Sequence, residues 1–143
     1  MSSVSICGRY CSAWAGARCA VEERHGAHFA RFGGDDAVQA LHRDGGAARR
    51  RTLTLELDNF VAACRRAVAR ADGEAAVATL RSAWEATITQ GAFELAIELG
   101  TRVDTLADVA PSSRAAALTA LGRAHIAAGR LERASALLER ALA

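Results

Sequence analysis

The chain contains no lysine, because all eighteen of its basic residues are arginine. This absence excludes several kinds of site. A phosphate-binding loop of the G-x4-G-K-[ST] type needs a lysine, and so do the phosphate-contacting site of protein kinases and Schiff-base catalysis. The motifs G-x-S-x-G and H-E-x-x-H are also missing. We therefore nominate no catalytic residue and expect neither an enzyme nor a cofactor.

Aromatic residues and proline are also scarce. Aromatics make up 5% of the 143 residues, and Pro111 is the single proline. Alanine and leucine, which are strong helix formers, are abundant, whereas the residues typical of strands are too few for a sheet protein. The chain is long enough for one core. Composition therefore predicts an all-α fold, with the glycine pairs at residues 33–34 and 45–46 as breaks between helices.

Charge is nearly balanced, with a formal net charge of +2. Arg49, Arg50 and Arg51 form the one local basic run, and three more arginines follow at positions 65, 66 and 70. The acids Glu56 and Asp58 interrupt this series, and no aromatic residue is interleaved for stacking on bases. A solvated helix face is therefore favoured. Nucleic-acid contact through the helix that carries Arg49–Arg51 is kept as an alternative function.

The C-terminal thirty residues carry the most informative spacing. It consists of Leu118-x2-Leu121-Gly122-x2-His125, followed by Gly129, Leu131, Ala134, Leu138 and Ala141. These offsets match a tetratricopeptide repeat, which is a hairpin of two helices. Gly122 is expected to let the second helix approach, and Gly129 to end the first helix in the left-handed conformation. Leu131 and Leu138 are expected to face back into the hairpin.

A fainter copy of the pattern lies upstream. Its marker residues are Leu80, Trp84, Gly91, Phe93 and Ala96. Gly91 and Gly129 are 38 residues apart, as are Ala96 and Ala134, against a usual period of about 34. The loop at residues 107–113 accommodates the excess. We expect helices at about residues 47–71, 74–90, 92–106, 112–128 and 130–143, with Trp84 buried and Trp14 exposed.

The middle of the chain resembles a known family. The segment Val21-Glu-Glu-Arg-His25-Gly-Ala-His28-Phe29 is followed by Arg49-Arg50-Arg51 and by Glu56-Leu57-Asp58-Asn59-Phe60. This order is similar to the helical region after the nucleotide-binding and winged-helix domains of bacterial STAND-type (NB-ARC-like) signal-transduction ATPases with tetratricopeptide repeats. The resemblance covers about residues 21–143. It implies a cytoplasmic signalling fragment that lacks the ATPase domain.

These observations predict a right-handed α-solenoid of antiparallel helix hairpins. Residues 1–20 are expected to be poorly ordered or unrelated to the family. Residues 21–72 form a helical linker that resembles the segment after the winged helix, and residues 73–143 form two tetratricopeptide-like hairpins, of which the last is truncated.

Three of the four cysteines lie near the N-terminus as Cys7-x3-Cys11-x7-Cys19, with His25 and His28 close behind. A zinc site needs four ligands, usually as two close pairs, and only Cys7 and Cys11 have a suitable spacing. Reduced cysteines without metal are therefore favoured over zinc. Cys64 is expected to pack in the core.

The predicted function is that of a protein-protein interaction module, a scaffold or sensor arm of a signal-transduction or transcription regulator. Its partner is a protein or peptide segment in the groove of the repeats, and the candidate contact residues are Arg81, Glu85, Thr119 and Arg123. Self-association through the uncapped C-terminal helix is a second outcome, and a remnant fragment without independent function is an alternative. We expect no membrane partner. If His125 is buried, the packing of the last hairpin is expected to depend on pH.

Overall fold

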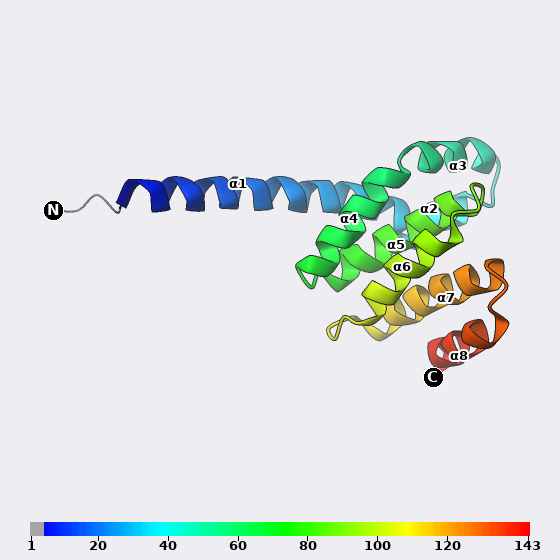
Figure 1. Cartoon of the computed structure of the whole chain (residues 1–143). Helices are drawn as coiled ribbons and strands as arrows, with labels where there is room; N and C mark the ends of the chain where they lie inside the picture. Colours follow the sequence, from blue (N-terminus) through cyan, green and yellow to red (C-terminus); the bar gives the residue numbers. More distant parts are fainter. Residues whose placement is uncertain (1–4) are drawn as a thin grey trace.

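The structure is a computed structural model that describes the backbone of residues 5–143 and the side chains of residues 16–17 and 20–143. Over this range the fold is all-α, which confirms the prediction from composition (Figure 1). The elements are α1 (Ser5–Ala30), the 3₁₀ turn η1 (Arg31–Gly33), α2 (Asp35–Ala40), α3 (Gly46–Leu55), α4 (Leu57–Ala69), α5 (Gly73–Thr87), α6 (Phe93–Asp104), α7 (Pro111–Ala127) and α8 (Leu131–Leu142).

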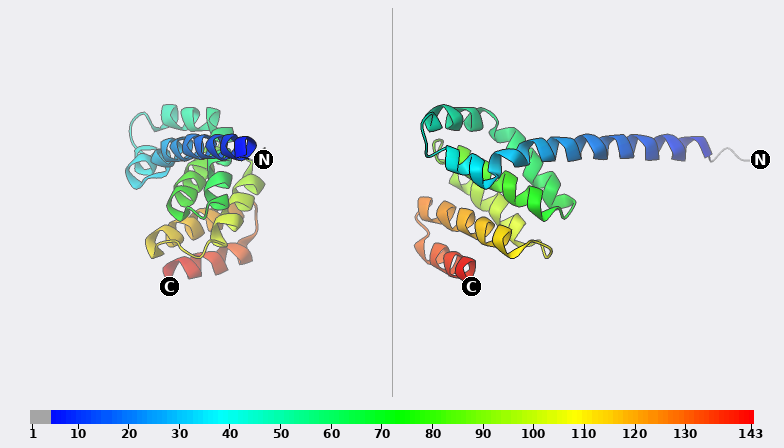
Figure 2. Two further views of the ribbon diagram at one scale, coloured as in Figure 1. Left: turned by 90° about the vertical axis from the view of Figure 1, so that its left-hand side faces the viewer. Right: turned by 180° about the vertical axis from the view of Figure 1, so that it is seen from behind.

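Successive helices from α4 to α8 pack on one another in chain order, as stacked hairpins do. The helix α5 lies at the centre and contacts α1, α2, α3, α4, α6, α7 and η1. The N-terminal part of α1 extends away from the other helices (Figures 1 and 2). Since α1 passes through residue 20, the backbone has no break at the boundary predicted there, and the unrelated origin of residues 1–20 stays a prediction. Trp14 lies outside the described side chains.

Local signals fix the ends of the C-terminal helices. Gly91 and Gly129 follow α5 and α7 with φ angles of 73° and 75°, in the left-handed region that glycine adopts without strain. Asp72 caps α5 by accepting a hydrogen bond from the amide of Ala75, and Pro111 occupies the first turn of α7. The four helices predicted from residue 74 onward are therefore confirmed.

The single long helix predicted at residues 47–71 is wrong, because the chain turns at Glu56 between α3 and α4. Thr52 and Thr54 each donate a side-chain hydrogen bond to the carbonyl four residues earlier, an arrangement that bends helices. The turn lets α3 pack on α5 while α4 packs on α1, α5 and α6. Tertiary packing thus overrides the uninterrupted helical spacing.

The core joins α1 to the hairpins through aromatic rings. Phe29 and Phe32 lie edge-to-face on Phe60, with ring centroids 5.4 and 5.6 Å apart. Cys64 and Trp84 are buried, as predicted. Burial raises the pKa of the Cys64 thiol to about 11, so this cysteine is neutral at physiological pH and packs as a small apolar residue.

The packing of the second hairpin agrees with the prediction at Gly122 and differs from it at Leu131. A Cβ atom on Gly122 would lie 2.9 Å from the Leu138 side chain, so glycine is needed for the close approach of α8. Leu131, however, is 66% exposed and does not face into the hairpin. In the first hairpin the equivalent residue, Phe93, contacts Trp84. Gly122 occupies the position equivalent to Trp84, so Leu131 has no large partner.

None of the described helices is both long and apolar enough to span a bilayer.

Candidate functional site

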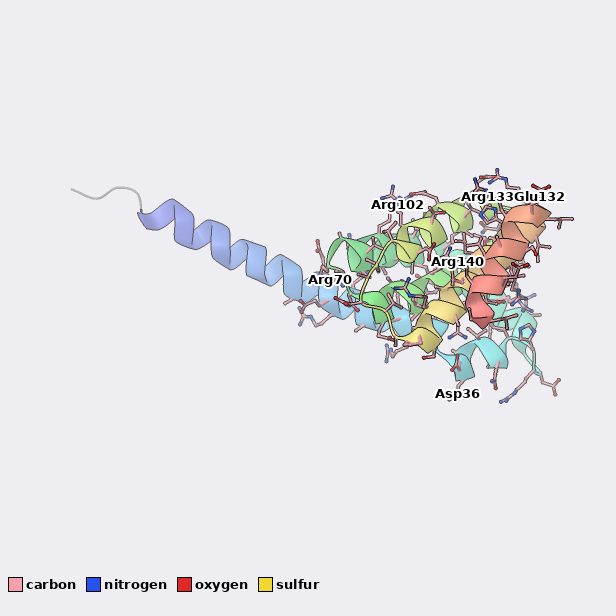
Figure 3. All side chains as sticks on the ribbon, turned by 90° about the horizontal axis from the view of Figure 1, so that it is seen from below. Asp36, Arg70, Arg102, Glu132, Arg133 and Arg140 are labelled. Carbon is pink, nitrogen blue, oxygen red and sulfur yellow. The ribbon has the colours of Figure 1, made fainter. Side chains whose placement is uncertain are left out.

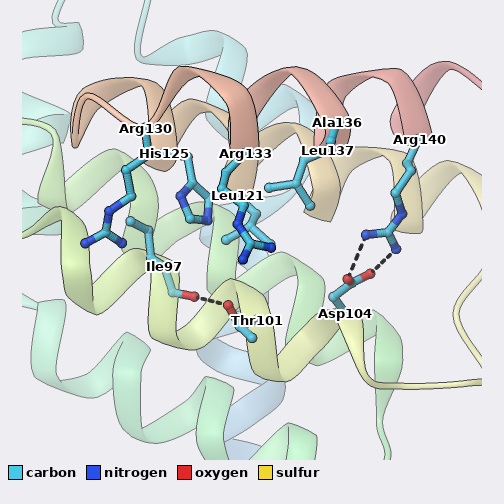
Figure 4. Close-up of a pocket in the computed structure, with 10 residues that line it drawn as sticks. All are labelled: Ile97, Thr101, Asp104, Leu121, His125, Arg130, Arg133, Ala136, Leu137 and Arg140. Atoms are coloured by element: carbon cyan, nitrogen blue, oxygen red, sulfur yellow. Dashed lines mark hydrogen bonds and ion pairs between the residues drawn. The ribbon is translucent and has the colours of Figure 1, made fainter.

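A groove of about 540 Å³ lies between α6 and α8, with α7 as its floor (Figure 4). We call it the α6–α8 groove. Its lining consists of Ile97, Thr101, Asp104, Leu121, His125, Arg130, Arg133, Ala136, Leu137 and Arg140. The volume falls within the range of about 300–1,000 Å³ that is usual for small-ligand sites. The groove is therefore large enough to hold several side chains of a partner.

Two ion pairs cross from α8 to α6, one toward each end of the groove. Arg130 pairs with Glu94, and Arg140 donates two hydrogen bonds to Asp104 at 2.9 and 3.1 Å. The hydrogen bond and charge of Asp104 raise the pKa of Arg140. Each pair joins residues that are 36 positions apart, which means that α6 and α8 run in the same direction in a fixed register.

Arg133 and Arg140 both extend from α8 (Figure 3), and Arg133 lies between the two ion pairs (Figure 4). The same register places Ile97, an apolar residue, across from it on α6. Glu98, which follows Ile97 in the sequence, pairs with Arg65 and Arg102 instead. Within residues 20–143, no acidic side chain forms an ion pair with Arg133. The groove therefore contains one uncompensated guanidinium.

His125 extends from α7 into the groove beside Arg130 and Arg133. Its Nδ1 atom is buried and has no hydrogen-bond partner. Burial lowers the pKa of His125 below its ordinary value, and the charges of Arg130 and Arg133 lower it further, against a smaller opposing effect of Glu94. The ring is therefore neutral at physiological pH.

The apolar part of the lining comes from all three helices. Ile97 and Leu121 are buried, and Leu137 is half-buried against the core. A segment that occupies the groove would cover these side chains and leave its own polar groups near the arginines. Thr101, the hydroxyl in the lining, donates its hydrogen bond to the carbonyl of Ile97 at 2.8 Å.

The four contact residues predicted from the sequence do not form one exposed surface. Thr119 and Arg123 are exposed on α7, and the Arg123 guanidinium lies 5.8 Å from the centre of the Trp84 ring. Arg81 is half-buried and pairs with Asp35. The expectation that Glu85 lies off the packing face is wrong, since it is 2% exposed and pairs with Arg50 at 3.2 Å.

The physical reason is that α3 and the segment η1–α2 pack against α5, on the side where the sequence predicted an open surface. A smaller hollow of about 250 Å³ remains there, lined in part by Gly33, Asp35, Arg81 and Ser113. The binding role of Arg81, Glu85, Thr119 and Arg123 stays a prediction.

The basic run Arg49–Arg51 serves largely to hold the local fold. Arg49 donates hydrogen bonds to the carbonyls of Ala40 and Asp44. Arg50 bonds the carbonyl of Leu41 and pairs with the buried Glu85. Two of the three guanidinium groups are thus occupied within the chain, which makes the run a poor row of phosphate contacts.

In the part of the chain whose side chains are described, no three His, Cys, Asp or Glu residues are arranged to hold a metal ion. The zinc site considered from the sequence would use Cys7, Cys11 and Cys19, and these residues lie outside that part.

Sequence reasoning missed the α6–α8 groove, although a signal for it was present. When the two repeat copies are aligned at their offset of 38, Arg133 replaces Leu95 and His125 replaces Thr87. Leu95 packs against the core, and Thr87 is fully buried. Two positions that are apolar or small in the first copy are therefore basic in the second.

Comparisons of the chain with protein-family models, with curated proteins and with solved structures give no match, so function is inferred from the geometry above.

Proposed function

We propose that the chain is a protein-protein interaction module, built as a short right-handed solenoid of tetratricopeptide-like hairpins. One observation carries the proposal: the last hairpin ends in a helix that is covered on one side only. Among the described elements, α8 packs closely on α7 alone. Leu131 and Leu142, at its two ends, are 66% and 89% exposed. Exposed apolar side chains on the outer face of a helical repeat are typical of a surface that receives another helix.

Equivalent positions in the two hairpins support the repeat interpretation. Ala96 and Ala134 are buried in the second helix of each hairpin, and Leu80 and Leu118 are buried in the first. The left-handed turns at Gly91 and Gly129 complete the correspondence. Hairpins of this kind stack on neighbours and bind partners along the stack. A place in a signal-transduction ATPase of the STAND type, suggested by residues 21–143, belongs to the same proposal.

The test is light scattering combined with circular dichroism across a concentration series. We expect the wild-type mass to rise with concentration, because a second molecule is the first available partner for the exposed face of α8. The double variant L131Q/L142Q should remain monomeric and keep its helicity. L55Q is the matched control, since Leu55 is 85% exposed on α3, away from α8. A monomer at every concentration would contradict α8 as a docking face.

A further inference from the structure

We propose that the α6–α8 groove binds an acidic peptide segment, with a carboxylate on Arg133 and a neighbouring apolar side chain against Ile97, Leu121 and Leu137. The inference rests on the proposed function and names the chemistry of one partner. It uses a surface distinct from the exposed apolar residues Leu131 and Leu142 of α8.

The charges of the groove favour an acidic partner. The groove lining contains three arginines and one acid, Asp104. Arg140 is neutralised by Asp104, and Arg130 by Glu94 just outside the lining. Arg133 is left without an acid in the middle of the groove, across from Ile97. A carboxylate from a partner would complete the row of ion pairs between the two helices.

His125 has a buried ring nitrogen beside the groove. Its Nδ1 atom has no partner within the described residues, and an unbonded buried polar atom costs roughly 1–3 kcal/mol. The ring lines the same groove as Arg133. Because this atom is closed to solvent, the His125 ring contributes to a peptide site as part of the groove wall rather than through a hydrogen bond from Nδ1.

The equivalent seam of the preceding hairpin has different side chains. There α4 packs against α6, and the residues equivalent to Arg133 and His125 are Leu95 and Thr87, which take part in the core or are fully buried. That seam is closed by the chain itself. In the α6–α8 seam the two helices do not pack directly on each other, and a hollow of about 540 Å³ lies between them, lined in part by basic side chains.

A peptide fits these features better than a free phosphate or a nucleic-acid backbone. A single unpaired guanidinium gives a phosphate only one charged contact, whereas Ile97, Leu121 and Leu137 offer apolar surface that a phosphate would not cover. An acidic segment with an apolar neighbour uses both parts of the groove.

The experiment is a selection from a random twelve-residue peptide library displayed on phage, carried out on the wild-type chain, on R133E and on R51E. Arg51 is exposed on α3 and has no ion pair among the described residues, so R51E makes the same change of charge away from the groove. We expect the wild type and R51E to enrich peptides with Asp or Glu beside an apolar residue. R133E should lose this enrichment while keeping its circular dichroism spectrum.

Fluorescence anisotropy with the most enriched peptide then measures the effect. We expect R133E to raise Kd by about tenfold or more and R133Q by less, since the first replaces attraction by repulsion and the second only removes it. Replacing the acids of the peptide by their amides should weaken binding to the wild type and have little effect on binding to R133E.

Three results would overturn the inference. They are selection without acidic enrichment, equal binding by R133E and wild type, and displacement of the peptide by millimolar inorganic phosphate, which would indicate a simple anion site. If one of these results is obtained while self-association still depends on Leu131 and Leu142, the peptide-binding inference fails and the proposed function stands. Loss of that association with peptide binding intact would contradict α8 docking alone.

Discussion

The two C-terminal hairpins follow one spacing but have different surroundings. In the first, α5 packs against helices before and after it in the chain, and all of residues 82–87 are buried. In the second, α8 packs closely on α7 alone within the described structure, and Ala134 is its single buried residue. The comparison shows that the repeat spacing sets the hairpin geometry, whereas neighbouring elements decide which side chains are buried.

Side chains at equivalent positions of the two hairpins also differ in size. The first hairpin has the large pair Trp84 and Phe93, and the second has Gly122 and Leu131 at the equivalent positions. Gly122 in turn makes room for Leu138, whose equivalent in the first hairpin is Gly100. A Cβ atom on Gly100 would instead meet Leu121 of α7, so the two glycines permit close approach to different helices.

The largest expected effect on stability concerns Trp84, the buried aromatic residue of the first hairpin. W84A removes a buried ring from the first hairpin and should lower the free energy of unfolding by about 3–5 kcal/mol. L131A truncates an exposed side chain of the second hairpin and should change the free energy of unfolding by no more than about 0.5 kcal/mol. Urea denaturation followed by circular dichroism measures both, at a protein concentration where the chain is monomeric. Similar losses in the two variants would mean that α8 is as well covered as α5.

An intermediate effect tests whether the hairpin turns are equivalent. G91A and G129A each force a Cβ atom into the left-handed region and should each cost about 1–2 kcal/mol. Neither position has an atom within 4 Å of an added Cβ, so the cost is local strain and not a clash. The same denaturation experiment should give nearly equal values. A cost confined to G91A would show that the second turn is not held in this conformation.

The smallest effect concerns pH. The pKa of His125 in the folded state lies below that of the unfolded chain, which is about 6.5. As the pH falls from about 7.5 through 6.5, the unfolded state gains protons first, so stability decreases toward the lowered folded pKa. H125T, which installs the residue of the first hairpin, should flatten this dependence between pH 7.5 and 5.5 in thermal melts. If stability changes equally with pH in the wild type and in H125T, groups other than His125 cause the pH dependence.

Sequence reasoning succeeded where the structural cause is local. Gly91, Gly129, Asp72 and Pro111 act within one or two turns of backbone, and the last four helices begin and end within about three residues of their predicted bounds. It failed at Glu56 and Glu85. Both errors concern where α3 lies, and that depends on packing against α5 rather than on any local signal.

The candidate site shows the same limit. The arginines of α8 were visible in the sequence, but which of them is unpaired depends on the register between α6 and α8. That register pairs Arg130 with Glu94 and Arg140 with Asp104, and it leaves Arg133 across from Ile97. Nothing in the spacing of either helix alone predicts it.

The sequence by itself determined an all-α chain with hairpin turns at two glycines and no lysine-dependent chemistry, because helix propensity, turn conformation and residue identity are properties of short segments. Only the tertiary structure decided that Glu85 is interior, that Leu131 is exposed and that Arg133 faces an open groove. Burial and charge pairing depend on residues brought together from distant parts of the chain, and here the packing of α3 on α5 and of α8 beside α6 brings them together.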